Sequence, residues 1–97
     1  MATALVTGGT GRVGRAITDR LTADGFRVLA AGRADGDVSR PTEAAGLVER
    51  CAAELGGLDL LVNAAADGFA PKAVEDVTET DWEAAFGATA RGSFFVT

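Results

Sequence analysis

The chain has 97 residues, 47% hydrophobic and 24% charged, so it has room for one small globular domain and lacks the composition of a disordered or collagen-like protein. Lys and Arg number 9 against 14 Asp and Glu, and the net charge of −5 has the wrong sign for neutralising a phosphate backbone, so we expect no nucleic-acid partner. No stretch approaches the roughly 20 apolar residues that a bilayer requires, and no leader precedes the apolar run at Ala4, so we expect a cytoplasmic protein without a membrane partner.

The first predicted unit is a strand, a glycine turn and a helix. Residues 4–7 (ALVT) are short, apolar and β-prone, and Gly8 ends this run. A helix is predicted to start near Arg12 and to stop at Gly25, which takes the left-handed conformation easily. The expected apolar face of this helix consists of Val13, Ala16, Ile17 and Leu21. Residues 26–32 (FRVLAAG) then predict a second strand, buried on both faces of a parallel sheet.

The middle of the chain continues the alternation of helices and strands. Residues 33–40 are too few for a helix and a strand, so we expect a turn and a short extended piece. Pro41 suits the first turn of a helix that ends at Gly56 and Gly57. The apolar stripe of this helix is predicted to be Ala44, Leu47, Val48, Cys51, Ala52 and Leu55. The single cysteine on that stripe is therefore interpreted as a core residue, and residues 58–63 (LDLLVN) predict a third buried strand.

A last helix is predicted after a loop at residues 64–77, in which Phe69 is the one aromatic residue. In TDWE, residues 80–83, Thr80 fits the N-cap and Glu83 the N3 position of a capping box. The apolar side of this helix is expected to carry Trp82, Ala85, Phe86, Thr89, Ala90, Ser93 and Phe94.

Three glycines, Gly8, Gly11 and Gly14, stand between the first strand and the first helix. In a dinucleotide-binding fold the first glycine permits the tight turn, the second lets the backbone approach a pyrophosphate, and the third lets the helix pack closely. The helix N-terminus would direct its N–H groups and the positive end of its dipole at the phosphates. The surrounding βαβ pattern favours this interpretation over a helix start that is merely rich in glycine.

The elements together predict one partial dinucleotide-binding domain over residues 1–97. Its fold class is α/β, a Rossmann-like three-layer αβα arrangement with a parallel sheet of strand order 2-1-3. We expect this domain to be incomplete, with about three strands and three helices.

Four separated segments resemble the N-terminal half of the short-chain dehydrogenase/reductase family. They are TGGTGRVG at 7–14, GDV at 36–38, LDLLVNAA at 58–65 and TETDWEAAFGATARGSFFVT at 78–97. The resemblance implies that Thr7 supports the glycine turn, that Asp37 and Val38 contact an adenine, and that Asn63 and the two alanines after it line the central cofactor groove. The cofactor-binding residues expected from motif and resemblance are Thr7, Gly8, Gly11, Arg12, Val13, Gly14, Arg33, Asp37, Val38, Asn63, Ala64 and Ala65.

Some of these residues have a second interpretation. Asp37 could begin a turn, and Asn63 could tie a strand end to its neighbour. Arg12 gives the form TGxxxRxG, which resembles pteridine reductases and would bring a guanidinium near the phosphates, but the glycine spacing also resembles extended and NmrA-like branches.

Arg33 bears on the choice of cofactor. Enzymes that use NAD carry an acid at the end of the second strand, whereas Gly32 and Arg33 leave room for a 2′-phosphate and supply a cation to clamp it. NADP is therefore the expected cofactor, with NAD possible. The alternative for Arg33 is a solvated turn residue.

The residues for proton transfer are not expected in this chain. The family that it resembles uses a tyrosine acidified by a lysine four residues later, assisted by a serine and often an asparagine. This chain has no tyrosine, Lys72 is expected to be a solvated loop residue, Ser93 does not match the serine, and Thr89 stands where the asparagine would be. No catalytic residue is predicted, and without histidine or clustered acids no metal site is predicted either.

The expected function is that of an NAD(P)-dependent oxidoreductase of this family, transferring hydride to or from a carbonyl or alcohol substrate. The chain would be its dinucleotide-binding half, inactive alone, and the complete protein a homo-oligomer. The alternative is a small non-catalytic regulatory module, similar to NmrA-like proteins, or a remnant without function. The apolar end at Phe94, Phe95 and Val96 favours the first reading, and the substrate stays open.

Overall fold

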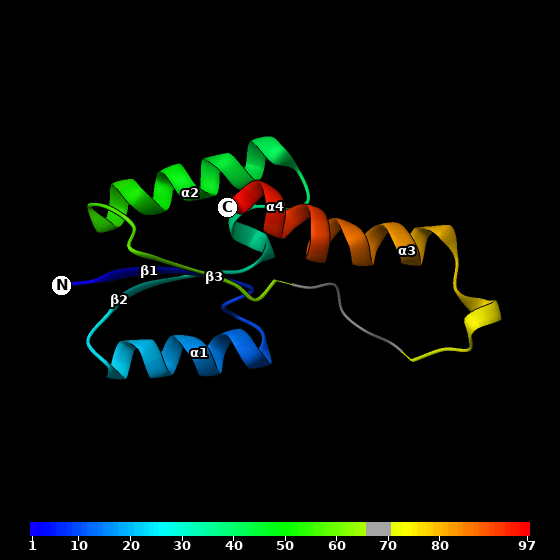
Figure 1. Ribbon diagram of the computed structural model, residues 1–97, viewed down its shortest axis with the longest axis horizontal. Coiled ribbons are helices and arrows are strands. Elements are labelled where there is room, and N and C mark those ends of the chain that lie inside the picture. Colours follow the sequence, from blue (N-terminus) through cyan, green and yellow to red (C-terminus); the bar gives the residue numbers. More distant parts are fainter. Residues whose placement is uncertain (66–70) are drawn as a thin grey trace.

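The computed structural model describes residues 1–65 and 71–97, so the expected loop aromatic Phe69 lies outside the described residues. Strands and helices alternate along the chain (Figure 1). The first part contains β1 (Thr3–Thr7), α1 (Arg12–Ala23), β2 (Arg27–Ala31), the 3-10 turn η1 (Arg33–Asp35), α2 (Pro41–Leu55) and β3 (Leu60–Asn63). The second part contains the 3-10 turn η2 (Val74–Asp76), α3 (Glu79–Phe86), the π-helical turn η3 (Gly87–Arg91) and α4 (Gly92–Val96).

The strands form a parallel three-stranded sheet in the order β2-β1-β3, which confirms the predicted topology. Thr7, the last residue of β1, is level with Ala31 of β2 and Asn63 of β3, so all three strands end at one edge of the sheet. Helix α1 covers one face, while α2 and α4 lie on the other (Figure 1). The three layers of the predicted Rossmann-like αβα fold are therefore present.

The core is centred on β1, which is buried along its whole length because it has a strand on each side and helices on both faces. Leu5, Ala31, Leu47 and Cys51 form the core cluster, and burial raises the pKa of the Cys51 thiol. The prediction that Cys51 is a core residue is confirmed.

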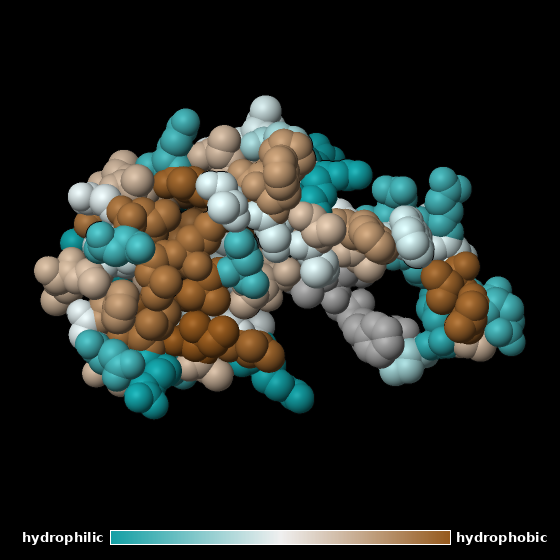
Figure 2. Space-filling model, in the orientation of Figure 1, coloured by the Kyte–Doolittle hydropathy of each residue, from teal (hydrophilic) through white to brown (hydrophobic). Residues whose placement is uncertain are grey.

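The prediction that the second and third strands are fully buried is wrong. Strand β2 begins with the exposed Arg27, β3 ends with the exposed Asn63, and the residues between are mostly half-buried. Both strands lie at an edge of the described sheet, where only one neighbouring strand covers them. In Figure 2, apolar side chains accordingly reach the surface between α1 and α2, where the sheet lies.

The packed face of helix α1 agrees only in part with the predicted one. Gly14 is buried and Ile17 and Leu21 are half-buried, whereas Val13 and Ala16 are exposed. The close approach of Gly14 to the glycine turn sets the rotation of the helix, and Val13 is one residue away from that face. For α2, Ala44, Leu47 and Cys51 are buried as predicted.

The predicted capping box at Thr80 and Glu83 is also wrong, because α3 is capped two residues earlier. The Thr78 hydroxyl accepts a hydrogen bond from the Asp81 N–H at 3.1 Å, and the Asp81 carboxylate accepts one from the Thr78 N–H at 2.9 Å. Lys72 Nζ adds an ion pair to the same carboxylate at 2.8 Å. Two donors thus converge on the Asp81 carboxylate, and together with the bond from the Asp81 N–H they place the start of the helix at Glu79.

The predicted apolar side of the last helix does not face the core. Trp82, Phe86 and Phe94 are 57%, 48% and 74% exposed, and the buried residues are instead Gly87, Gly92 and Val96. The five-residue π turn changes the direction in which the side chains after Phe86 point. A single apolar stripe with a period of 3.6 residues therefore cannot describe the whole segment. Trp82 and Phe86 stack on each other at 4.4 Å between ring centroids, and α3 extends away from the sheet (Figure 1).

Among the helices of the described ranges, 1–65 and 71–97, none has both the length and the apolar character needed to cross a membrane.

Candidate functional site

The turn after β1 is built by a backbone contact between two glycines. Gly8 adopts φ +65°, a left-handed conformation, and its carbonyl oxygen accepts a hydrogen bond from the Gly11 N–H at 3.1 Å. A Cβ on Gly14 would lie 1.9 Å from that same carbonyl oxygen, so only glycine allows α1 to come this close. A Cβ on Gly11 would meet nothing nearer than 3.4 Å, which leaves its backbone open to a ligand.

The N-terminus of α1 is free to receive an anion. The N-cap residue is Gly11, and within the described residues no side chain caps the helix. The first turn holds no acidic residue. The backbone N–H groups of this turn and the positive end of the helix dipole are therefore available to a negatively charged group.

A cleft of about 790 Å³ opens at this helix end, beside the carboxyl ends of β1 and β2. At this edge the chain leaves β1 for α1 on one face of the sheet and leaves β2 for α2 on the other face, and ligands of open α/β folds bind where such connections diverge. The predicted site residues that line the cleft are Thr7, Gly8, Gly11, Arg12, Val13, Gly14, Arg33, Asp37, Val38, Ala64 and Ala65.

Asn63 is the one predicted site residue that the structure does not bring to the cleft lining. Its side chain is exposed, and its Nδ2 donates a hydrogen bond to Thr97 Oγ1 at 3.3 Å. Asn63 thus links the end of β3 to the end of α4.

Thr7 joins the glycine turn to the segment that follows β3. Its buried hydroxyl accepts a hydrogen bond from the Ala65 N–H at 3.4 Å and donates one to the Val62 carbonyl at 3.4 Å. The Ala64 N–H donates to the Thr7 carbonyl at 3.2 Å, and a Cβ on Gly8 would lie 2.7 Å from the Ala64 carbonyl oxygen. The residues after β3 therefore form one wall of the cleft and support the turn from behind.

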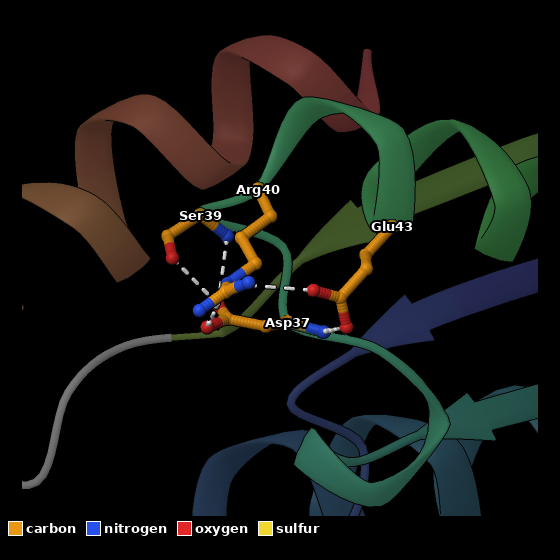
Figure 3. A network of polar contacts seen from close by, with 4 residues as sticks. All are labelled: Asp37, Ser39, Arg40 and Glu43. Carbon is orange, nitrogen blue, oxygen red and sulfur yellow. Dashed lines mark hydrogen bonds and ion pairs between the residues drawn. The ribbon is translucent and has the colours of Figure 1, made fainter.

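The opposite end of the cleft contains a polar network around Asp37 (Figure 3). Asp37 Oδ1 accepts hydrogen bonds from the Ser39 N–H at 3.0 Å and the Ser39 hydroxyl at 2.6 Å. These bonds, with smaller contributions from the charges of Arg40 and Arg33, hold the pKa of Asp37 below its ordinary value. Asp37 therefore stays ionised, and it begins a turn while also lining the cleft.

The network also fixes the main chain at this position. The Asp37 N–H donates to Glu43 Oε1 at 3.2 Å, and Arg40 Nε lies 3.5 Å from Glu43 Oε2. Through these contacts the first turn of α2 holds the residues before it (Figure 3).

A family model described as enoyl-(acyl carrier protein) reductase matches residues 13–97 of the chain. This chain belongs to the short-chain dehydrogenase/reductase family. A comparison with curated proteins gives no match.

Solved structures show the same fold. A 3-ketoacyl-(acyl-carrier-protein) reductase from Brucella melitensis, complexed with NADH, has a TM-score of 0.92 and 24% identity over 99% of this chain and 47% of its own. A blue fluorescent protein from a metagenomic library, in complex with NADPH, has a TM-score of 0.81 and 28% identity over 98% of this chain and 48% of its own. A protein from Novosphingobium aromaticivorans described as a short-chain dehydrogenase has 0.86 and 21%, over 98% and 43%. The chain spans about half the length of these structures.

The other residues considered for a chemical role lie at exposed or half-buried positions. Lys72 pairs with Asp81 at the start of α3, and Thr89 is exposed on the π turn. Ser93 is half-buried, and its carbonyl accepts a hydrogen bond from the Thr97 hydroxyl at 2.8 Å. Across residues 1–65 and 71–97, no three His, Cys, Asp or Glu side chains come together in a metal-binding group. The arrangement as described can bind and orient an anionic ligand.

Six residues of the cleft lining are not among the predicted site residues, although Gly32 is expected to leave room for a 2′-phosphate. They are Thr10, Ala31, Gly32, Gly36, Leu47 and Ala88. Gly32 had a readable signal, since it is a glycine directly after a strand. A Cβ there would lie 2.6 Å from Thr10 Oγ1, so Gly32 lets the glycine turn and the end of β2 meet. Leu47 and Ala88 had no such signal, because the rotation of α2 and η3 depends on packing.

Proposed function

We propose that this chain is the dinucleotide-binding part of an NAD(P)-dependent oxidoreductase, and that residues 1–97 make up a partial Rossmann domain. The observation that carries this proposal is the contact between Gly14 and Gly8, which directs an uncapped helix N-terminus into a cleft of about 790 Å³. Two proteins of the same fold form complexes with NADH and with NADPH, which supports a nicotinamide dinucleotide as the ligand class.

The lining residues fit the parts of such a cofactor. The open backbone at Gly11 and the first-turn N–H groups of α1 suit a pyrophosphate, with the Arg12 guanidinium near it. Asp37 and Val38 would hold the adenine end, while Ala64 and Ala65 would line the groove toward the nicotinamide. The bound cofactor would supply a hydride to a carbonyl or accept one from an alcohol.

We propose NADP as the preferred cofactor, because the acid nearest the end of β2 is already engaged. Asp35 Oδ2 accepts a hydrogen bond from the Gly32 N–H at 2.9 Å, and its Oδ1 lies 3.4 Å from Arg50 Nη2. Arg33 lines the cleft at the same strand end and would provide a cation for a 2′-phosphate.

The remaining parts of the proposal concern the complete protein. It would act on a small carbonyl or alcohol compound, in the cytoplasm, as a homo-oligomer. The proton donor of the reaction would lie outside these residues, because they include no tyrosine. The chain alone would therefore turn over no substrate. It would also bind cofactor weakly, because much of a full cofactor site is missing.

Titration of the isotope-labelled chain with NADPH, followed by amide NMR, tests this function. We expect the amide signals of Gly8, Gly11 and Gly14 to shift, with a dissociation constant of about 1 mM because much of a full cofactor site is missing. NMN, which lacks the adenosine half, is the matched ligand control and should shift them less. Unmoved glycine-loop signals at saturating NADPH would contradict the proposal, and micromolar binding would contradict the expected weakness.

A further inference from the structure

The C-terminal helical segment touches the loop at residues 36–39 through two glycines. A Cβ on Gly92 would lie 2.5 Å from Val38 Cγ2 and 3.2 Å from Val38 Cβ. A Cβ on Gly87 would lie 3.3 Å from Ser39 Cβ. Both glycines are buried, so the backbone of η3 and α4 rests directly on two side chains of the 36–39 loop.

The π turn is what brings these glycines to the same side. In a regular α-helix, residues five apart point in clearly different directions. Here the Gly92 N–H donates to the Gly87 carbonyl, the i→i+5 bond of a π turn, and this bond stacks the two positions one above the other. The irregularity therefore creates a contact surface that has no side chains of its own.

The loop that receives this contact is part of the cleft. Gly36, Asp37 and Val38 line it, and Ala88, next to Gly87, lines it from the helical side. Val38 also packs against the core cluster, so its side chain lies between the core and α4. The other side of the loop is held by Glu43 and Arg40 at the start of α2 (Figure 3).

We propose that Gly92 and Gly87 are positioning residues for the 36–39 wall of the cleft. They set how close η3 and α4 come to Val38 and Ser39, and through Ser39 they set the orientation of the Asp37 carboxylate. The inference rests on the proposed function, since the ligand expected at this wall is the adenosine half of a dinucleotide. Any volume added at position 92 would displace Val38, either toward the cleft or away from the core.

The test is Gly92→Ala, compared with Gly46→Ala as a matched control. Gly46 is a helical glycine of α2 whose added Cβ would meet nothing within 4 Å, so it reports the effect of alanine on a helix without a clash. The closer contact is with Val38 Cγ2, and because valine has a restricted χ1 and Val38 packs against the core, this methyl group cannot simply turn away and the loop has to shift.

The first readout needs no ligand. The Ser39 N–H is bonded to Asp37 Oδ1 and the Arg40 N–H to the Asp37 carbonyl, so exchange of these two amides reports whether the loop is held. We expect roughly tenfold faster exchange in Gly92→Ala and no change in Gly46→Ala. Exchange equal to that of the unmodified chain would overturn the inference.

The second readout is affinity for the two halves of the cofactor. We expect Gly92→Ala to weaken binding of 2′,5′-ADP by about tenfold and to leave binding of NMN unchanged. An equal loss for both ligands would show a general destabilisation and would overturn the positioning role. Absence of NADPH binding by the unmodified chain would contradict the proposed function instead, while the exchange comparison would still decide the inference.

Two further variants keep the test decisive if Gly92→Ala folds poorly. Gly87→Ala makes only the milder contact with Ser39 and should show a smaller increase in exchange. Val38→Ala removes both γ-methyl groups, so adding Gly92→Ala to it should accelerate exchange much less than Gly92→Ala does alone. Additive effects of the two changes would contradict the proposed contact.

Discussion

Gly14 lies so close to Gly8 that a single added carbon would come within 1.9 Å of the Gly8 carbonyl oxygen. The obstacle is backbone on both sides, so neither partner can turn away from the clash. We expect Gly14→Ala to destabilise the chain by about 3 kcal/mol or to prevent folding. Urea unfolding followed by circular dichroism measures the change.

Gly46→Ala is the control for this variant, since it adds the same carbon to a helix where there is space. It should leave stability unchanged or raise it by up to about 1 kcal/mol, because alanine has the higher helix propensity. Similar stabilities for the two variants would show that the Gly14 contact is not close in solution.

Thr7→Val tests the bridge between the glycine turn and the residues after β3. Valine keeps the shape of threonine but leaves the Ala65 N–H without its acceptor, so we expect a loss of about 1 to 2 kcal/mol. Exchange of the Ala65 amide should also become faster. Thr7→Ser keeps the hydroxyl and should retain the Ala65 protection, and a serine variant as unprotected as valine would contradict the bridge.

The start of α3 should be sensitive to acid. The hydrogen bond from Lys72 and the bonds from Thr78 lower the pKa of Asp81 from 3.8 to about 2. Because the folded pKa is the lower one, ionised Asp81 stabilises the cap above pH 4, and this contribution disappears as the pH falls from about 4 to about 2. Carboxyl carbon NMR shifts during an acid titration should show the Asp81 midpoint near the lower value.

Lys72→Gln should raise the pKa of Asp81 toward its ordinary value, because the principal donor changes from charged to neutral. Lys72→Arg keeps the charge and should change the midpoint less. An unmoved midpoint in Lys72→Gln would remove Lys72 from the cap.

Arg33→Asp should change the cofactor preference of the chain. A carboxylate at the end of β2 repels a 2′-phosphate and can accept hydrogen bonds from ribose hydroxyls, so the ratio of NADPH to NADH affinity should fall by at least about tenfold. The matched control is Arg27→Asp, which makes the same charge change at the exposed opposite end of β2. Equal affinity ratios in the two variants would exclude Arg33 from the site.

The order of elements could be predicted from the sequence because the conformations of β1 and of the three glycines depend on the local sequence. Tertiary packing did not override these preferences. Together these residues form one βα unit, in which a short apolar strand is followed by Gly8 at φ +65° and by a helix that touches the turn at Gly14. The part of the cleft lining from Thr7 to Gly14 follows from that unit. The second interpretation of Asp37, as a turn residue, is visible in its bonds to Ser39.

The errors arose where two local patterns competed or where the helix was irregular. Thr80 and Glu83 fit a capping box as well as Thr78 and Asp81 do, and the contact from Lys72, which favours the earlier start, involves residues 9 apart in sequence. Trp82, Phe86 and Phe94 fit one stripe only if the helix keeps 3.6 residues per turn. The π turn between Gly87 and Gly92, which brings both glycines against Val38 and Ser39, is not encoded by a regular helical period.

The partnership of Thr7 with Ala65 joins residues 58 apart, so the first turn of the protein is completed by a segment synthesised much later. Contacts of such long sequence separation form slowly, because a large loop has to close before they contribute. On the ribosome, the glycine turn of the N-terminal βα unit therefore lacks the contact between Thr7 and Ala65 until β3 and the residues after it have emerged. Nascent chains halted before β3 should leave that turn open to proteases, whereas chains that include Ala65 should protect it.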